Sequence, residues 1–186
     1  MNKIFNIILF ALFFASFVQA QNDGKTFEFT YEGQTLKYEV TVSKQQSEKI
    51  SGKVKIPESV TFAGEKYSVT RIGERTFYHC SSLTSVIIPN SVTTIGESAF
   101  SYCFGLTRVS IPNSVTTIGM HAFSGCTGLT ILTIENATPP NIEGGYAFDN
   151  VSEKITIYVP AESVEKYKTA NGWSKYADKI KAIPAK

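Results

Sequence analysis

A unit of 23 residues occurs three times in the middle of the chain, and this repeat limits the folds open to it. Residues 69–88, 92–111 and 115–134 align without a gap, and the stretches 88–96 and 111–119 both read IPNSVTTIG. A unit this short cannot bury its own apolar side chains, so each copy must be covered by the next one. The repeat therefore predicts a solenoid. Five positions recur in all three units: Ile72, Ile95 and Ile118; Gly73, Gly96 and Gly119; Phe77, Phe100 and Phe123; Cys80, Cys103 and Cys126; Leu83, Leu106 and Leu129.

Each unit has the apolar pattern of one short β-strand. Val109 and Ile111 alternate with polar residues, and Pro112 ends the strand because proline has no amide hydrogen to donate. Stacking of the units places equivalent strands side by side at about 4.8 Å, which predicts a parallel sheet. We expect the repeated glycine (Gly73, Gly96, Gly119) at a tight turn with positive φ. The side chains expected to point into the core are Val86, Ile88, Val109, Ile111, Leu132 and Ile134.

The recurring residues of the segment 69–135 resemble the repeat unit of the BspA-like leucine-rich repeat family of bacterial secreted and surface proteins. Looser copies flank them: residues 54–60 resemble a first unit interrupted by an insert at 61–68, and residues 157–160 resemble a last strand. Residues 138–153 depart from the pattern, so we expect an irregular fourth coil. The resemblance implies a mainly β solenoid, a right-handed leucine-rich repeat coil, that acts in surface or secreted interactions such as adhesion.

The first twenty residues, MNKIFNIILFALFFASFVQA, have the pattern of a secretory signal peptide. Lys3 precedes an apolar run from Ile4 to Phe17, and Val18-Gln19-Ala20 supplies small residues where signal peptidase cuts. An uncleaved N-terminal anchor is the alternative, although the run is shorter than the roughly 20 residues that a spanning helix needs. We expect a secreted or cell-surface protein with no stable membrane insertion after signal removal, and a periplasmic location remains open.

Both ends of the solenoid are expected to be capped. Alternating apolar residues on either side of Glu32-Gly33 predict a β-hairpin. At the other end, residues 161–170 read as a short helix, and Trp173, Tyr176, Ala177 and Ile180 recur at the spacing of a second helical face. The predicted organisation is a signal peptide at 1–20, an N-terminal β-hairpin cap at 21–52, the leucine-rich repeat solenoid at 53–160 and a C-terminal helical cap at 161–186.

Charge and composition exclude several function classes. A net charge of +2 provides no field that would attract nucleic acid, and 42% apolar residues are too many for a disordered chain. His79 and Cys80 are neighbours, but adjacent residues of an extended chain face opposite ways, so they should not form a nucleophile–base pair. His121 falls at another outer position of the repeat. We therefore expect no enzyme activity and no cofactor.

The three cysteines, Cys80, Cys103 and Cys126, form a column with one thiol in each coil. In leucine-rich repeats this position takes a small buried residue, so structural burial is the favoured interpretation. A disulfide between neighbouring coils is an alternative, because export leads through oxidising compartments. A zinc site is the weakest alternative, since three thiols lack a fourth ligand and no C-x-x-C pair is present.

If the core residues point inward, the alternate residues of each strand form one outer face. Solenoids commonly bind along such a face, and arginine and tyrosine are enriched in binding hot spots. We predict binding of an extracellular or cell-surface protein there, with a glycan-binding module or a self-assembling structural protein as alternatives. The partner's identity and the oligomeric state are left open. The predicted face comprises Lys53, Lys55, Ser85, Ile87, Arg108, Ser110, Ile131, Thr133, Thr156 and Tyr158.

Overall fold

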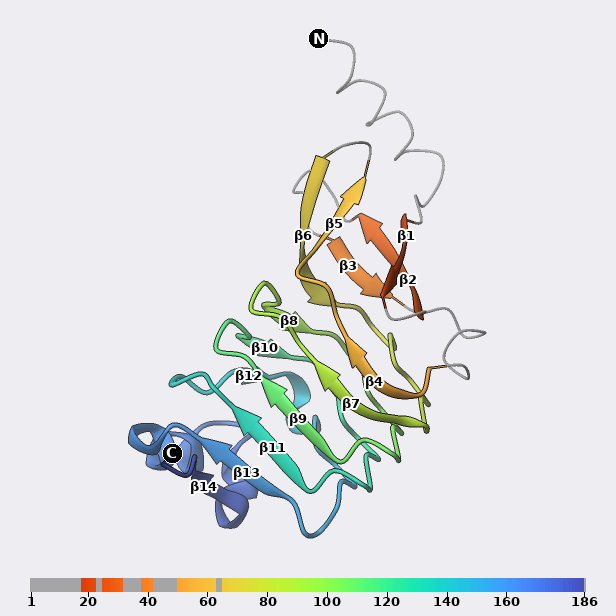
Figure 1. The fold of residues 1–186 in the computed structure, drawn as a ribbon. Coiled ribbons are helices and arrows are strands. Elements are labelled where there is room, and N and C mark those ends of the chain that lie inside the picture. The colour runs from red at the N-terminus through yellow and green to blue at the C-terminus, as the bar shows by residue number, and fades with distance from the viewer. Residues whose placement is uncertain (1–17, 23–24, 32–37, 42–49, 63–64, 186) are drawn as a thin grey trace.

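The computed structural model describes residues 18–22, 25–31, 38–41, 50–62 and 65–185. Two sheets run along the molecule, and the chain winds from one to the other in successive coils (Figure 1). This arrangement confirms the predicted mainly β solenoid.

The sheet facing the viewer in Figure 1 contributes one strand from each coil. Every neighbouring pair is parallel, as the repeat predicts. Six strands form it, in chain order: β4 (Gly52–Lys55), β7 (Leu83–Ile87), β9 (Arg108–Ile111), β11 (Ile131–Ile134), β13 (Thr156–Val159) and β14 (Ile180–Ala182).

The second sheet combines short coil strands with the N-terminal strands. Its coil part is parallel, whereas its N-terminal part is an antiparallel meander joined to the first coil by parallel pairing of β3 with β6. The antiparallel pairing of β2 with β3 confirms the predicted hairpin. The strands are β1 (Val18–Asn22), β2 (Lys25–Tyr31), β3 (Tyr38–Thr41), β5 (Ser59–Phe62), β6 (Glu65–Ile72), β8 (Thr94–Ile95), β10 (Thr117–Ile118) and β12 (Asn141–Ile142).

The structure covers only part of the predicted N-terminal organisation. Residues 1–17 of the predicted signal peptide and the predicted turn at Glu32-Gly33 lie outside the described residues. Residues 18–20 belong to β1, so cleavage after Ala20 would shorten that strand. The insert at 61–68 is itself part of a hairpin, because β5 pairs antiparallel with the first half of β6.

In each coil a third side leads from the short strand of the eight-stranded sheet to the next strand of the six-stranded sheet, and this side holds the phenylalanines. Their amides form a ladder from coil to coil: Phe77 donates to the carbonyl of Ala99 at 2.7 Å, and Phe100 donates to the carbonyl of Ala122 at 2.7 Å. The rings of Phe77, Phe100, Phe123 and Phe148 stack in one column with centroids 5.0, 5.0 and 5.4 Å apart.

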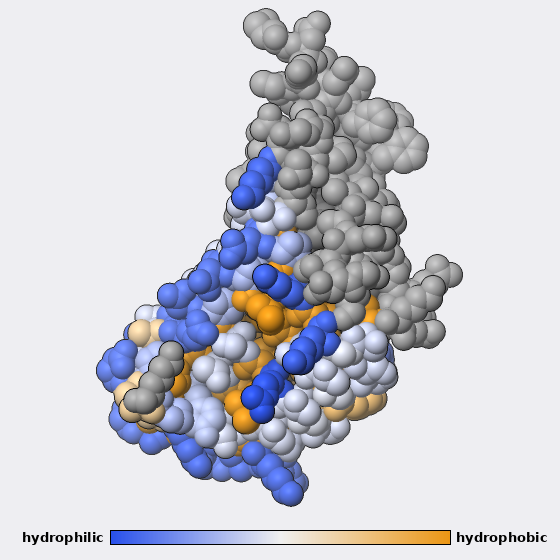
Figure 2. All heavy atoms as spheres, viewed as in Figure 1, coloured by the Kyte–Doolittle hydropathy of each residue, from blue (hydrophilic) through white to orange (hydrophobic). Residues whose placement is uncertain are grey.

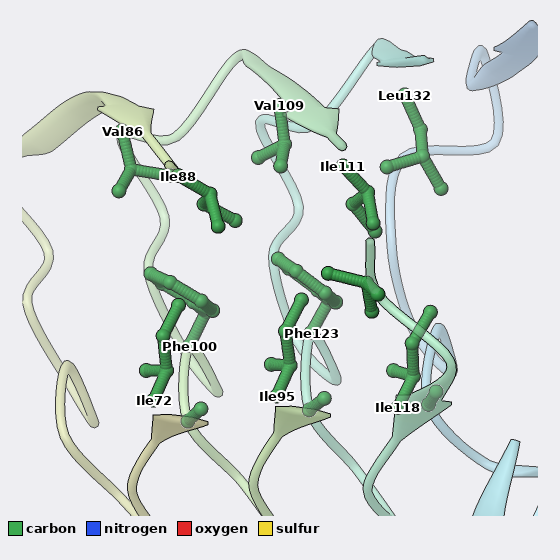
Figure 3. Packing of buried hydrophobic residues seen from close by; sticks show 14 of the residues in the cluster. Ile72, Val86, Ile88, Ile95, Phe100, Val109, Ile111, Ile118, Phe123 and Leu132 are labelled. Carbon is green, nitrogen blue, oxygen red and sulfur yellow. The ribbon is translucent and has the colours of Figure 1, made fainter. Parts of the chain in front are cut away.

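The predicted core residues are all buried. Figure 3 shows Val109 and Ile111 extending from one sheet and Ile95 and Ile118 from the other, with the phenylalanine rings between them. All six predicted inward residues are 7% exposed or less: Val86, Ile88, Val109, Ile111, Leu132 and Ile134.

The repeated glycines do not have the positive φ that the sequence led us to expect. Their role is to let neighbouring coils approach. A Cβ on Gly96 would lie 2.8 Å from the backbone carbon of Gly73, and one on Gly119 would lie 2.6 Å from the backbone nitrogen of Glu97. The amide of Gly119 also donates to the carbonyl of Ile95 at 2.8 Å, so the backbones are held at this distance.

The fourth coil is irregular, as predicted. Its aligned phenylalanine, Phe148, follows Phe123 by 25 residues because of the short 3-10 turn η1 (Glu143–Gly145). Gly144 and Gly145 in that turn have φ of 65° and 74°. Glycine adopts such values without steric penalty, so this pair accommodates the extra residues.

The C-terminal segment closes the last coil with helical turns and a strand. The predicted helix at 161–170 is present as η2 (Ala161–Ser163) and α3 (Val164–Thr169), followed by the 3-10 helix η3 (Ser174–Lys179). Trp173 is fully buried, its indole NH donates to the carbonyl of Pro140 at 2.8 Å, and its ring lies 5.6 Å from that of Phe148. The expected helical position of Ile180 was wrong: it begins β14, which pairs with β13 and continues the sheet.

Candidate binding face

The outward residues of the six-stranded sheet form two rows that cross the strands, as the alternation predicts. Strand pairing fixes their order, since each residue is directly opposite its neighbour on the next strand. The first row is Lys53, Ser85, Arg108, Ile131 and Thr156, and the second is Lys55, Ile87, Ser110, Thr133 and Tyr158. We call these two rows the strand face. All ten predicted residues therefore share one surface, and all are exposed or half-buried.

The strand face combines an apolar anchor with positive charge. Ile87 is 55% exposed, the largest exposure of any large hydrophobic residue in the described ranges. Arg108 lies next to Ser85 and Ile131 in the first row, and Lys53 and Lys55 stand at one end. Figure 2 shows apolar surface between strongly hydrophilic side chains over this side of the molecule.

One acidic side chain is hydrogen-bonded to a residue near the centre of the strand face. Ser110 Oγ donates to Glu135 Oε1 at 2.8 Å, which positions a carboxylate beside the second row.

The sequence missed one residue of this surface. Lys181 on β14 pairs with Tyr158, so it extends the second row by one strand and adds a cation at the far end. A strand of three residues is too short for alternation to distinguish it from the end of a helix. The parallel stacking of strands, rather than the local pattern, places Lys181 on the face.

The cysteine column is buried in the core, in agreement with the structural interpretation. Each of Cys80, Cys103 and Cys126 has no exposed surface. Cys103 Sγ donates to the carbonyl of Phe77 and Cys126 Sγ to that of Phe100, both at 3.0 Å. The thiols thus satisfy carbonyls of the preceding coil. Burial raises the pKa of Cys80 to about 12, and the neighbouring thiol of Cys126 together with burial raises the pKa of Cys103.

We expect the three thiols to be inert in the folded protein. The raised pKa values of Cys80 and Cys103 keep these two thiols protonated near pH 8, and burial excludes the reagent from all three. Titration with a disulfide reagent at pH 8 should label no cysteine in native protein and three in guanidinium. Native labelling as fast as that of the unfolded chain would contradict this assignment.

The two histidines lie apart from any thiol. His79 is exposed whereas Cys80 is fully buried, so the two side chains lie on opposite sides of the chain. His121 is half-buried and stacks on Tyr146 with ring centroids 5.7 Å apart. Within the described ranges, no group of three or more His, Cys, Asp and Glu side chains is placed to hold a metal ion. Over the same residues, no helix has the length and apolarity needed to cross a bilayer.

The repeat geometry agrees with comparisons to known proteins. A family model described as a BspA type leucine rich repeat region matches residues 53–171 in six copies. The chain belongs to the BspA-type leucine-rich repeat family. No curated protein matches it significantly.

Several solved bacterial leucine-rich repeat structures are similar to this BspA-type chain. A leucine-rich repeat protein from Bacteroides ovatus is 29% identical, with a TM-score of 0.53 over 72% of this chain and 36% of that one. One from Bacteroides capillosus is 26% identical, with a TM-score of 0.60 over 76% and 97%. A leucine rich cell surface protein from Faecalibacterium prausnitzii is 25% identical, with a TM-score of 0.51 over 77% and 45%. The BspA-type chain thus spans about a third of the first relative and nearly all of the second.

Proposed function

We propose that this protein is an exported interaction module that binds an extracellular or cell-surface protein through the strand face. The observation that carries the proposal is the two-row register: cations and an exposed isoleucine are held side by side on six parallel strands. Each of the ten side chains projects from a hydrogen-bonded ladder and has at least one buried chain neighbour, so little backbone order is lost on binding.

The dimensions of the strand face suit a protein partner. Five steps between strands at about 4.8 Å give a length of roughly 24 Å, which is comparable with one side of a standard protein interface. Arg108, Tyr158 and Ile87 supply the aromatic, guanidinium and aliphatic groups found at interface centres. Because Lys53, Lys55 and Lys181 lie at the two ends and Arg108 lies near the middle, the complementary partner carries acidic groups at both ends and opposite Arg108.

Two observations support export of the protein. The N-terminal twenty residues have the pattern of a signal peptide. The similar protein from F. prausnitzii is described as a cell surface protein. Both support exposure of the strand face to molecules outside the cell.

The test is capture from extracellular and cell-surface extracts with protein lacking residues 1–20. We expect Ile87→Asp combined with Arg108→Glu to lower retention of the captured protein at least tenfold, because the first change places a charge at the apolar anchor and the second reverses a central cation. Lys66→Glu is the matched control, since Lys66 is exposed on the β5–β6 hairpin and away from the face. Circular dichroism should be the same for all variants. Equal retention by the double variant and the control would reject the strand face as the binding surface.

A further inference from the structure

A cluster of aromatic rings lies outside the strand face, on the third side of the first two complete coils. It consists of Tyr78 and His79 from one coil and Tyr102 and Phe104 from the next, and we call it the aromatic corner. The His79 and Tyr102 rings stack with centroids 4.7 Å apart and planes at 17°. Tyr78 meets Tyr102 edge-on at 5.8 Å, and Phe104 meets Tyr102 at 6.1 Å. Tyr102 is 40% exposed and Phe104 is 45% exposed, so the cluster is in contact with water.

The backbone holds two of these rings in an unfavourable conformation. His79 and Tyr102 both have φ of 59°, in the left-handed region. The equivalent residues of the next two coils are Gly125, with φ of 72°, and Asn150, with φ of 54°. Glycine and asparagine adopt this region most readily and histidine is enriched there, whereas tyrosine adopts it only at a steric cost. The fold therefore requires the conformation in every coil, but it does not require an aromatic ring there.

The rings are fixed in place before any ligand arrives. The His79 amide donates to the carbonyl of Ser101 at 2.9 Å, and the Tyr102 amide donates to that of Ser124 at 2.8 Å. Tyr102 also lies against Gly125, since a Cβ at that glycine would be 2.7 Å from the ring. The fold requires the left-handed backbone at this position, but it does not require an exposed, rigid aromatic surface there.

The polar atoms around the rings indicate the kind of ligand. Tyr78, His79 and Tyr102 each carry a hydrogen-bonding atom on an apolar ring. The guanidinium of Arg75 lies 5.7 Å from the centroid of Tyr78 and pairs with Glu74 at 3.7 Å. The large exposed hydrophobics at the corner are aromatic, whereas exposed Ile87 belongs to the strand face. A ligand that fits such a surface offers C–H groups to the ring faces and hydroxyl groups to the rim.

We propose that the aromatic corner is a binding site for a neutral glycan, whose sugar rings pack on Tyr102 and Phe104. A second exposed ring supports an extended ligand: Tyr146 is 51% exposed, stacks on His121 and has the Lys175 ammonium 5.2 Å from its centroid. It lies two coil steps beyond Tyr102, at the repeat position of Ser98 and His121.

The experiment measures glycan binding by the protein without residues 1–20. The probes are galactomannan and xyloglucan, each used in affinity electrophoresis gels, and an array of neutral oligosaccharides. We expect retardation by at least one probe and a tenfold or greater loss of affinity in Tyr102→Asn combined with Phe104→Ala. The substitution to asparagine copies Asn150, so the melting temperature should stay the same or rise while binding is lost.

Matched variants separate this site from the strand face. Ile87→Asp combined with Arg108→Glu should keep its glycan affinity, whereas the aromatic variant should keep its protein capture. Wild-type protein that binds none of the glycan probes overturns the assignment, as does equal glycan affinity in the aromatic variant. Capture of a protein through the strand face would persist in either case, so the two proposals fail independently.

Discussion

Replacing Phe100 with alanine is expected to lower the free energy of unfolding by about 3–5 kcal/mol. The ring is fully buried and stacks between Phe77 and Phe123 at 5.0 Å on each side. Its loss removes apolar contacts with both neighbouring coils and leaves a cavity in the middle of the column. Because coils of a solenoid are stabilised mainly by their immediate neighbours, the cavity weakens two interfaces at once.

Urea unfolding followed by far-ultraviolet circular dichroism measures this effect. Phe104→Ala is the matched control, because Phe104 is the same residue type four positions later and is 45% exposed. We expect the control to change the free energy of unfolding by less than about 1 kcal/mol. Similar losses in the two variants would show that the column does not stabilise the coils in the way proposed here.

Replacing Gly119 with alanine is expected to lower the free energy of unfolding by about 3 kcal/mol, at the upper end of the range for overpacked sites. The added Cβ would lie 2.6 Å from two backbone atoms, the Glu97 nitrogen and the Gly96 carbon. Backbone atoms cannot rotate away as a side chain can, so the coils must separate. Separation would lengthen the bond from the Gly119 amide to the Ile95 carbonyl, which is 2.8 Å in the native coil.

Gly52→Ala is the control that separates crowding from backbone strain. Gly52 has φ of 68°, but a Cβ there meets nothing within 4 Å. Its substitution should therefore cost only the left-handed penalty of about 1–2 kcal/mol. Hydrogen exchange of the Gly119 amide should accelerate in Gly119→Ala and stay the same in Gly52→Ala. A smaller loss at Gly119 than at Gly52 would contradict the close-approach explanation.

The sequence predicts the coil and its two faces because they depend on periodicity. Once Val109 and Ile111 point inward, strand geometry requires Arg108 and Ser110 to point outward. The 23-residue step then sets which residues are opposite each other on neighbouring strands, and the pairing of Arg108 with Ile131 follows. The strand face could thus be assembled from the repeat alone.

Features that depend on contacts between coils were not predictable in the same way. Gly119 is required by the backbone of the preceding coil, which no local pattern reveals. Ile180 has helical spacing from Trp173, yet the exposed edge of β13 supplies hydrogen-bond partners that a helix would leave unused. At the aromatic corner, His79, Tyr102 and Gly125 share one repeat position but differ in type. In the sequence, this variation indicates a position that tolerates any side chain. The structure shows instead that the aromatic residues found there stack on each other.

The ladder between coils has a consequence for how genes of this kind change in length. Gly96 donates to Ile72 and Gly119 donates to Ile95 with the same 2.8 Å geometry, so the junction on either side of a coil is interchangeable. Unequal recombination within the two IPNSVTTIG codon tracts would delete or duplicate one whole turn and still rejoin compatible surfaces. Each such event would shorten or lengthen the molecule by about 4.8 Å and leave both capping segments in place. If this process occurs, natural variants should differ in length by multiples of 23 residues.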